Sequence, residues 1–253
     1  MMDDGIPQYL PAIVLDIIFS NLEPHDLLSC MLVCQNWYQI LNNDKAVPWR
    51  LMCQRKISQK ILKSELLSNL NSPKAKLRAL YHAWNPLDCS DHIMIEQNGF
   101  TLHRNLFPQR PNMVRTKIGY MNGKHVWEIT WIKPPRTVAM VGVSTQGEPI
   151  HQCDYVPLLG IDKYSWGWNL SNNVLLHNGI KQGSYPSIKN TSNSISGEKI
   201  KLVLDCENGV LHFEKSNEFL GIAFKNLPKL KLYPTVGTIF GSSKVSVVYI
   251  GKS

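Results

Sequence analysis

The sequence predicts an α+β protein with more than one domain, in which a small N-terminal helical module and a helical linker precede a C-terminal antiparallel β-sandwich. Before residue 86, apolar residues recur every three or four positions, as in amphipathic helices. Beyond it, short runs of β-branched and aromatic residues alternate with Gly, Asn, Asp and Pro, without helical segments between them. We place the first module at residues 1–51, the linker and the start of the second domain at 52–86, and the sandwich at 87–253.

The first helix is predicted from an apolar stripe that ends before Asn21 and Pro24. Pro11 fits its first turn, because a backbone N–H there has no partner within the helix. The stripe consists of Leu10, Val14, Ile17 and Ile18.

A second helix is predicted to begin near Asp26, whose carboxylate can accept hydrogen bonds from unpaired backbone N–H groups at the start of a helix. We expect it to continue to residue 41. Its stripe consists of Leu27, Met31, Cys34, Tyr38 and Leu41.

Three further helical segments are expected before residue 86. Pro48 opens a short helix, and residues 57–70 form an amphipathic segment. Ser72 is a predicted N-cap, followed by Pro73 in the first turn of a helix that extends through Tyr81.

The second domain contains runs with the composition of β-strands, at residues 126–131, 138–143, 200–204, 210–213 and 245–250. Asn122-Gly123, Asn178-Gly179 and Asn208-Gly209 are turn signals between such runs. For Asn208-Gly209 we predict the two-residue loop that type I′ hairpins favour.

The N-terminal module carries more large apolar side chains between Leu10 and Trp49 than its short helices can bury among themselves. A module of this size buries only about 60% of the surface that its unfolded chain exposes. Some of these side chains must therefore face another surface, and the module is predicted to dock on a partner protein.

Several classes of function are disfavoured by the composition and the motifs. The net charge is +8, but Lys and Arg are dispersed, which does not favour a nucleic-acid groove. Eighteen consecutive uncharged apolar residues are absent from the sequence, so we expect neither membrane insertion nor secretion, and we expect a cytoplasmic protein.

No catalytic pattern is present either. The sequence lacks a nucleophile elbow, a P-loop, an H-E-x-x-H motif and a dinucleotide-binding glycine motif. The eight histidines do not pair at helical spacing, and the six cysteines form neither a zinc set nor a disulfide framework. We expect no catalytic residue, no cofactor and no metal, with any chemistry supplied by another subunit.

The loops of the predicted sandwich are rich in aromatic residues and asparagine, a composition suited to peptide recognition. Polar loops at residues 133–136, 147–155 and 240–243 are the expected ligand edge. The alternative for the tryptophans is a place in the core. Candidate substrate-binding residues are Arg136, Tyr155, Tyr164, Trp166, Asn178 and Phe240. An alternative function is a lectin-like, glycan-binding adaptor, because jelly-roll sandwiches with exposed Trp can also hold sugars.

Residues 6–51 resemble the F-box, the Skp1-binding motif of ubiquitin-ligase adaptors, at more than a dozen positions. These include Leu10-Pro11, Asp26-Leu27-Leu28, Leu32-Val33-Cys34 and Trp37-Tyr38. By this resemblance, eight residues would form or support the Skp1 contact: Leu10, Pro11, Leu15, Leu27, Leu28, Cys30, Val33 and Trp37.

The second domain resembles a B30.2/SPRY domain, which implies a concanavalin-like jelly roll. The match includes residues 125–129, Val141-Gly142-Val143, Ser165-Trp166-Gly167-Trp168, His177-Asn178-Gly179 and Tyr233-Pro234. Nearly end to end, the chain resembles the F-box/SPRY domain-containing protein 1 family of synaptic F-box proteins. The resemblance implies a substrate adaptor of an E3 ubiquitin ligase that binds Skp1, target proteins and a very large Pam/Highwire-type RING ligase, and that controls synapse growth.

Overall fold

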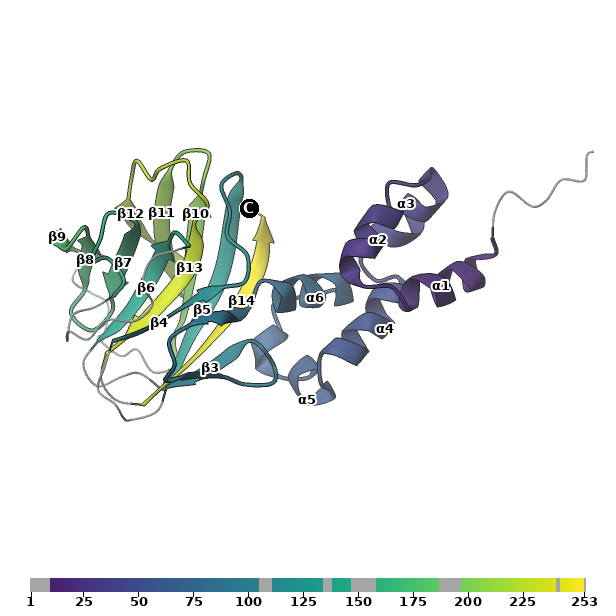
Figure 1. Ribbon diagram of the computed structural model, residues 1–253, viewed down its shortest axis with the longest axis horizontal. Coiled ribbons are helices and arrows are strands. Elements are labelled where there is room, and N and C mark those ends of the chain that lie inside the picture. The colour runs from purple at the N-terminus through teal and green to yellow at the C-terminus, as the bar shows by residue number, and fades with distance from the viewer. Residues whose placement is uncertain are drawn as a thin grey trace, which may run out of the picture. The chain divides into compact units, whose positions relative to one another are not determined.

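The computed structural model describes residues 10–104, 111–133, 138–146, 158–186, 197–239 and 242–252 (Figure 1). The chain forms two compact units, Met1–Arg78 and Ala79–Ser253. The first contains helices and the second contains two β-sheets, and each is considered by itself. Every helix among the described residues is too short or too polar to cross a bilayer.

The secondary structure of the first unit is helical in its described part, and the last helix continues three residues past the end of the unit at Arg78. They are α1 (Ala12–Ser20), α2 (Pro24–Cys30), α3 (Gln35–Asn42), α4 (Val47–Lys56), α5 (Gln59–Leu62), the 3₁₀ turn η1 (Glu65–Leu67) and α6 (Pro73–Tyr81). The predicted roles of two residues are confirmed. Pro48 lies in the first turn of α4, and the Ser72 hydroxyl accepts a hydrogen bond from the Ala75 N–H at 3.1 Å, which caps α6.

A small apolar core holds the first unit together. Leu15 and Phe19 of α1 are fully buried, as is Leu41 of α3. The indole N–H of Trp49 in α4 donates to the Leu41 carbonyl at 2.8 Å, which ties α4 to the end of α3. Each large side chain buried in this way contributes roughly 1.5–3 kcal/mol.

The prediction of one long second helix was wrong, because the structure has two helices, α2 and α3. After α2, the N–H groups of Leu32 and Val33 donate to carbonyls only three residues back, at 3.0 and 3.2 Å, so the helix tightens into a turn. Cys34 is then extended, at φ −157° and ψ 165°, and α3 starts in a new direction.

The amphipathic segment predicted over residues 57–70 is also interrupted. Only α5 and η1 are helical there. Between them Ser64 is extended, and its hydroxyl donates to the Ile61 carbonyl at 2.7 Å. Such local side-chain bonds compete with the helical backbone pattern, which explains why the apolar periodicity did not produce one continuous helix.

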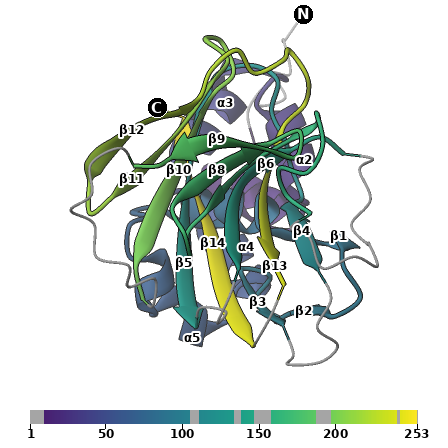
Figure 2. The same ribbon diagram turned by 90° about the vertical axis from the view of Figure 1, so that its left-hand side faces the viewer.

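The second unit is a sandwich of two seven-stranded sheets with antiparallel neighbours (Figure 2). Sheet A has the order β1 (Trp84–Cys89), β4 (Asn112–Thr116), β13 (Tyr233–Thr238), β6 (Ala139–Ser144), β7 (Ser165–Asn169), β8 (Val174–His177) and β9 (Ile180–Ser184). Sheet B has the order β12 (Glu218–Phe224), β11 (Val210–Lys215), β10 (Lys199–Asp205), β5 (Lys124–Lys133), β14 (Ser243–Lys252), β3 (Thr101–Arg104) and β2 (Ile93–Ile95).

The sandwich core follows from alternation along the strands. On β5, Trp127, Ile129 and Trp131 are at most 1% exposed. Trp168 of β7 packs against Phe213 of β11, with ring centroids 5.0 Å apart, so the two sheets meet through aromatic side chains. All five predicted strand runs coincide with strands, and the predicted antiparallel sandwich is confirmed.

The predicted two-residue hairpin at Asn208-Gly209 was wrong, because β10 and β11 pair at Asp205 and Val210 and leave a four-residue loop. The Asp205 carboxylate accepts hydrogen bonds from both the backbone and the side-chain amide of Asn208, each at 2.9 Å, which stabilises the longer loop. Gly209 has a positive φ of 62° but Asn208 does not, whereas a type I′ turn needs both.

The two-residue turn occurs instead at Asn178-Gly179. These residues have φ values of 52° and 71° and join β8 to β9, where His177 pairs with Ile180.

Candidate partner-binding surfaces

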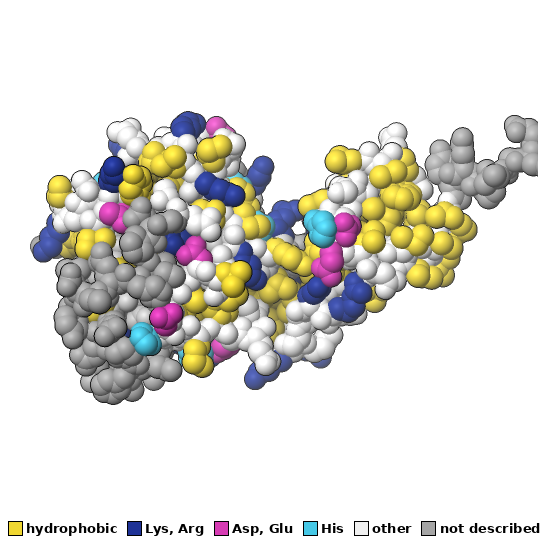
Figure 3. All heavy atoms as spheres, in the orientation of Figure 1, with side chains coloured by type: hydrophobic (Ala, Val, Ile, Leu, Met, Phe, Trp, Pro, Cys, Tyr) yellow, Lys and Arg dark blue, Asp and Glu magenta, His cyan; other side chains and the backbone are white. Residues whose placement is uncertain are grey.

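The helical unit exposes a set of large apolar side chains. Leu32 is 87% exposed, and Ile13, Val33, Ile17 and Leu28 are between 57% and 70% exposed. Apolar atoms gather over these helices in the space-filling view (Figure 3). Contiguous apolar surface of this kind marks sites of protein interaction.

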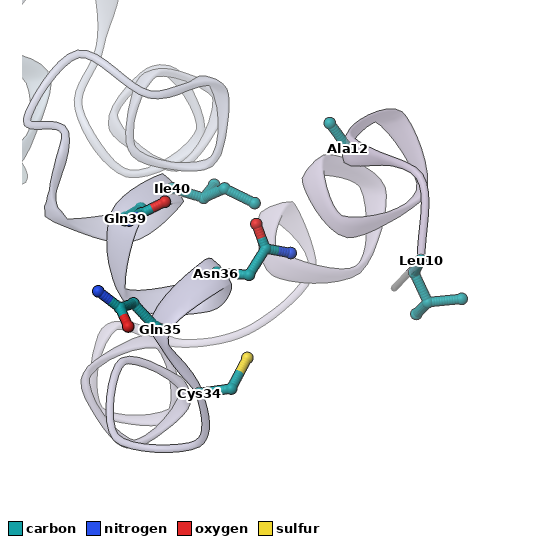
Figure 4. Close-up of a pocket in the computed structure, with 7 residues that line it drawn as sticks. All are labelled: Leu10, Ala12, Cys34, Gln35, Asn36, Gln39 and Ile40. Carbon is teal, nitrogen blue, oxygen red and sulfur yellow. The ribbon is translucent and has the colours of Figure 1, made fainter. Parts of the chain in front are cut away.

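Two grooves flank α1. One lies between α1 and α3, has a volume of about 460 Å³ and is lined by Leu10, Ala12, Cys34, Gln35, Asn36, Gln39 and Ile40. In Figure 4, the Asn36 amide and the Cys34 thiol point into the gap between the two helices. The other lies between α1 and α4, has a volume of about 690 Å³ and includes Ile13, Ile17 and Leu51. Helix α1 therefore presents apolar side chains to grooves on both of its sides.

The eight residues expected at the Skp1 contact fall into three groups. Exposed are Leu10, Pro11, Leu28 and Val33, half-buried are Cys30 and Trp37, and fully buried are Leu15 and Leu27. The last two can only support the surface from within. Trp37 packs edge-on against Phe19 of α1, with centroids 5.1 Å apart, so it joins the surface to the core.

Three strongly exposed residues, Ile13, Ile17 and Leu32, were missed among the candidate site residues. Ile13 and Ile17 are four apart on α1, and that spacing was the available signal. It identified an apolar face, but it did not distinguish the face that packs inward, on Leu15 and Phe19, from the face that remains exposed.

On the sandwich, the structure brings together the candidate residues that it describes. The backbone carbonyl of Asp162 accepts from the Asn178 N–H at 2.9 Å, and its carboxylate accepts from the Tyr164 N–H at 2.8 Å. Tyr164 is 36% exposed, so it and the Asn178 turn form one accessible corner. Trp166 is buried and stacks on His177 at 4.8 Å, which makes it a support of this corner.

Arg136, Tyr155 and Phe240 lie outside the described residues, as do most of the polar loops expected at the ligand edge. The lectin-like alternative rested on exposed tryptophan. None of the tryptophans of the sandwich is more than 5% exposed. They belong to the core, which removes the observation that motivated glycan binding.

The buried and half-buried thiols among the described residues have the properties of structural cysteines. Burial raises the pKa of Cys206 to about 11, and Asp205 and Glu207 add to the effect. Burial also raises the pKa of Cys53 and, together with Asp26, that of Cys30. A protonated thiol is a poor nucleophile and a poor metal ligand. Within the described part of the chain, no cluster of His, Cys, Asp or Glu could hold a metal ion.

Buried histidine is also used structurally. The ring of His125 is fully buried, and its two nitrogens contact the Tyr249 hydroxyl and the Asn122 carbonyl, each at 2.9 Å. Burial lowers its pKa, Lys252 lowers it further, and the Asn122 contact partly opposes both. A histidine that is enclosed among aromatic neighbours, with its pKa lowered by burial, is a packing residue.

Comparison with known proteins yields matches for both units. A family model described as F-box-like matches residues 8–55, and a SPRY domain model matches residues 124–251. The F-box/SPRY domain-containing protein 1 of Drosophila erecta is 50% identical over 238 residues, which cover 94% of this chain and 93% of the relative. The protein of that name from Aedes aegypti is 47% identical over 253 residues, with 99% and 98% covered.

Solved structures match the sandwich. The SPRY domain of human HERC1 has a TM-score of 0.54 and 22% identity, and covers 66% of this chain and 98% of its own. The TRIM65 PSpry domain has a TM-score of 0.51 and 17% identity, with 68% and 94% covered. At these identities the likeness is one of fold.

Proposed function

Because this chain belongs to the F-box/SPRY domain-containing protein 1 family, we propose that it selects target proteins for an E3 ubiquitin ligase by joining Skp1 to those targets. The family consists of F-box plus SPRY adaptors and is not catalytic. Ubiquitin transfer is accordingly assigned to other subunits. We propose that residues 1–51 dock on Skp1, that residues 52–86 connect this module to the sandwich, and that residues 87–253 bind the target.

The observation that carries the Skp1 proposal is the exposed apolar surface of α1–α3. Leu28 and Val33 are 57% and 62% exposed in the isolated chain, although both are large aliphatic side chains. Covering such side chains gains about 25 cal/mol per Å² of apolar area removed from water, before the costs of association. A protein partner with a complementary groove would recover that energy.

We assign target binding to the loop edge of the sandwich. Tyr164 and Asn178 support this assignment, since they share Asp162 as a hydrogen-bond partner and are accessible. Trp166 holds that edge from within. Arg136, Tyr155 and Phe240 remain candidates on sequence grounds.

The physiological setting that we propose is the cytoplasm of the synapse, with a Pam/Highwire-type RING ligase as the second partner and control of synapse growth as the outcome. Family membership supports this setting. Co-purification of the native protein from neuronal tissue, with quantitative mass spectrometry against a deletion of residues 10–51, would test it. Retention of the large RING ligase together with loss of Skp1 from the deleted form would place the two partners on separate surfaces.

Binding of purified Skp1 to the full chain tests the docking surface. Leu28→Asp combined with Val33→Asp should weaken the complex at least about a hundredfold, because interface anchors contribute about 2 kcal/mol or more each. Ile180→Asp is the matched control, since Ile180 is 59% exposed but lies on β9. Skp1 affinity that is equal in the double variant and the control would reject the proposal.

A further inference from the structure

One corner of the sandwich carries two lysines, which precede the two strands on either side of β6. β13, β6 and β7 are neighbours in sheet A (Figure 1), and Ser144 near the end of β6 pairs with both Tyr233 and Ser165. Because β13 and β7 both run antiparallel to β6, the residues that precede them lie at the same end of the sheet. Lys231 and Lys163 occupy those positions, on either side of the chain that leaves β6.

The backbone at this corner is held between two tyrosines. The N–H of Thr145 donates to the Tyr164 carbonyl at 3.0 Å, and the Tyr233 hydroxyl donates to Oε1 of Gln146 at 3.0 Å. The ammonium group of Lys163 lies 4.9 Å from the centroid of the Tyr164 ring, and that of Lys231 lies 5.9 Å from the Tyr233 centroid. Each lysine therefore rests over an aromatic face, which orients its charge.

These two lysines differ from those on sheet B. Lys199, Lys215 and Lys244 each pair with a carboxylate, at distances between 2.8 and 3.2 Å. Among the described residues, neither Lys163 nor Lys231 has a carboxylate partner. Oδ1 of the adjacent Asp162 carboxylate accepts from the Tyr164 N–H and the Ser165 hydroxyl, each at 2.8 Å, and this carboxylate forms no ion pair with Lys163.

We propose that this corner, formed by Gln146, Lys163, Tyr164, Lys231 and Tyr233, binds an acidic, extended segment of the target protein. The proposal rests on the role of the sandwich as the target-binding half of the adaptor. Two positive charges that have no carboxylate partner among the described residues complement the carboxylates of a target, and Tyr164, 36% exposed, offers a ring for the side chain between them.

The geometry also predicts the spacing of the acidic residues. β13 and β7 are separated by two strand spacings, so the two lysines emerge about 10 Å apart. An extended chain covers this distance in about three residues. The preferred segment should therefore carry Asp or Glu at two positions that are two to four residues apart, with an apolar or aromatic residue between them.

Selection from a phage-displayed library of random 12-residue peptides on the immobilised full chain tests this specificity. The wild-type protein should enrich peptides with paired acidic residues at that spacing. Lys163→Glu combined with Lys231→Glu should bind the selected peptides at least about tenfold more weakly and lose the preference for acids. Lys225→Glu is the matched control, because Lys225 is exposed and follows β12 of sheet B, and it should keep the preference.

The outcomes separate this inference from the proposed function. Enriched peptides without acidic residues, or equal binding by the double variant and the control, would overturn the acidic specificity and leave target binding by the sandwich in place. No enrichment of any peptide would count against both. Skp1 binding by each variant, measured in parallel, should be unchanged, which shows that the helical unit is folded, and an unchanged thermal unfolding midpoint shows that the sandwich is folded.

Discussion

At the scale of single residues, two side chains of the same type have different roles when one is buried and the other is exposed. Leu27 and Leu28 are adjacent leucines on α2, yet Leu27 is fully buried and Leu28 is 57% exposed. Both belong to the motif that resembles an F-box. The motif alone therefore does not separate Leu27, which supports the surface from within, from Leu28, which is part of the surface. Their substitutions should therefore affect different measurements.

Leu27→Ala should lower the free energy of unfolding of the helical unit by about 2–5 kcal/mol, through lost burial and the cavity that remains. Leu28→Ala should change it by less than about 1 kcal/mol, because the side chain is mostly in water already. Urea denaturation of the full chain, followed by helical circular dichroism, measures both. Equal losses for the two variants would contradict the burial assigned to them.

The buried histidines predict a pH dependence of stability. Burial lowers the pKa of His125 and of His212 below the ordinary value in the unfolded chain, which is about 6.5. Below that value the unfolded state binds more protons than the folded state, so stability is complete above about pH 6.5 and falls as the pH drops toward 5. Glu96 and Asp205, whose pKa values are lowered from 4.5 and 3.8, respond at lower pH.

Thermal unfolding of the full chain between pH 8 and pH 5 checks this expectation. The midpoint should be flat above about pH 7 and should decrease below it, and His125→Gln should reduce the slope. A midpoint that rises as the pH falls through this range would show that these rings are protonated in the folded protein.

At the scale of elements, strand composition and helix capping were sufficient to predict much of the structure. The run of β-branched and aromatic residues at 126–131 identified β5, and Ser72 with Pro73 identified the start of α6. The break between α2 and α3 could not be found in this way, because the apolar stripe continues through the turn at residues 31–34. Likewise the two-residue turn was expected at Asn208-Gly209, but Asp205 stabilises a longer loop there.

The candidate site was predictable only in part for a similar reason. Sequence patterns identified Tyr164, Trp166 and Asn178 as one group of aromatic and turn residues. These residues lie together because of Asp162, which accepts hydrogen bonds from Asn178 through its backbone carbonyl and from Tyr164 through its carboxylate. Such tertiary bonds have no periodic signature. The surplus of apolar side chains in the helical unit was visible in the sequence. Which of them remain exposed is decided by the packing of α1 against α4, which the sequence does not show.

Two glycines allow a test of how tightly this part of sheet A is packed. Gly160 and Gly183 both have positive φ, but a Cβ at Gly160 would lie 2.6 Å from the Leu176 carbonyl oxygen, whereas one at Gly183 would have no atom within 4 Å. Gly160→Ala should therefore destabilise the sandwich by about 1–3 kcal/mol more than Gly183→Ala. Chemical denaturation of both variants measures the difference, and equal stability would contradict the close approach at Gly160.

At the scale of the whole molecule, the helical unit and the sandwich divide the work of an adaptor. The helical unit, with fewer than half as many residues as the sandwich, exposes a comparable set of large apolar side chains among the described residues, while the sandwich encloses its tryptophans. Obligate partners are held by apolar burial, whereas exchangeable targets are selected by charge and by a few anchors. On the proposed function, this division would let one chain hold a ligase subunit through its helical unit and a target through its sandwich.

The most direct test of the central claim is hydrogen–deuterium exchange of the full chain, with and without saturating Skp1. Exchange should slow in α1, α2 and α3, at residues 12–42, and should be unchanged in sheets A and B. A complex that protects the sandwich and leaves α1–α3 unaltered would contradict the claim that the exposed apolar surface of the helices is the docking site.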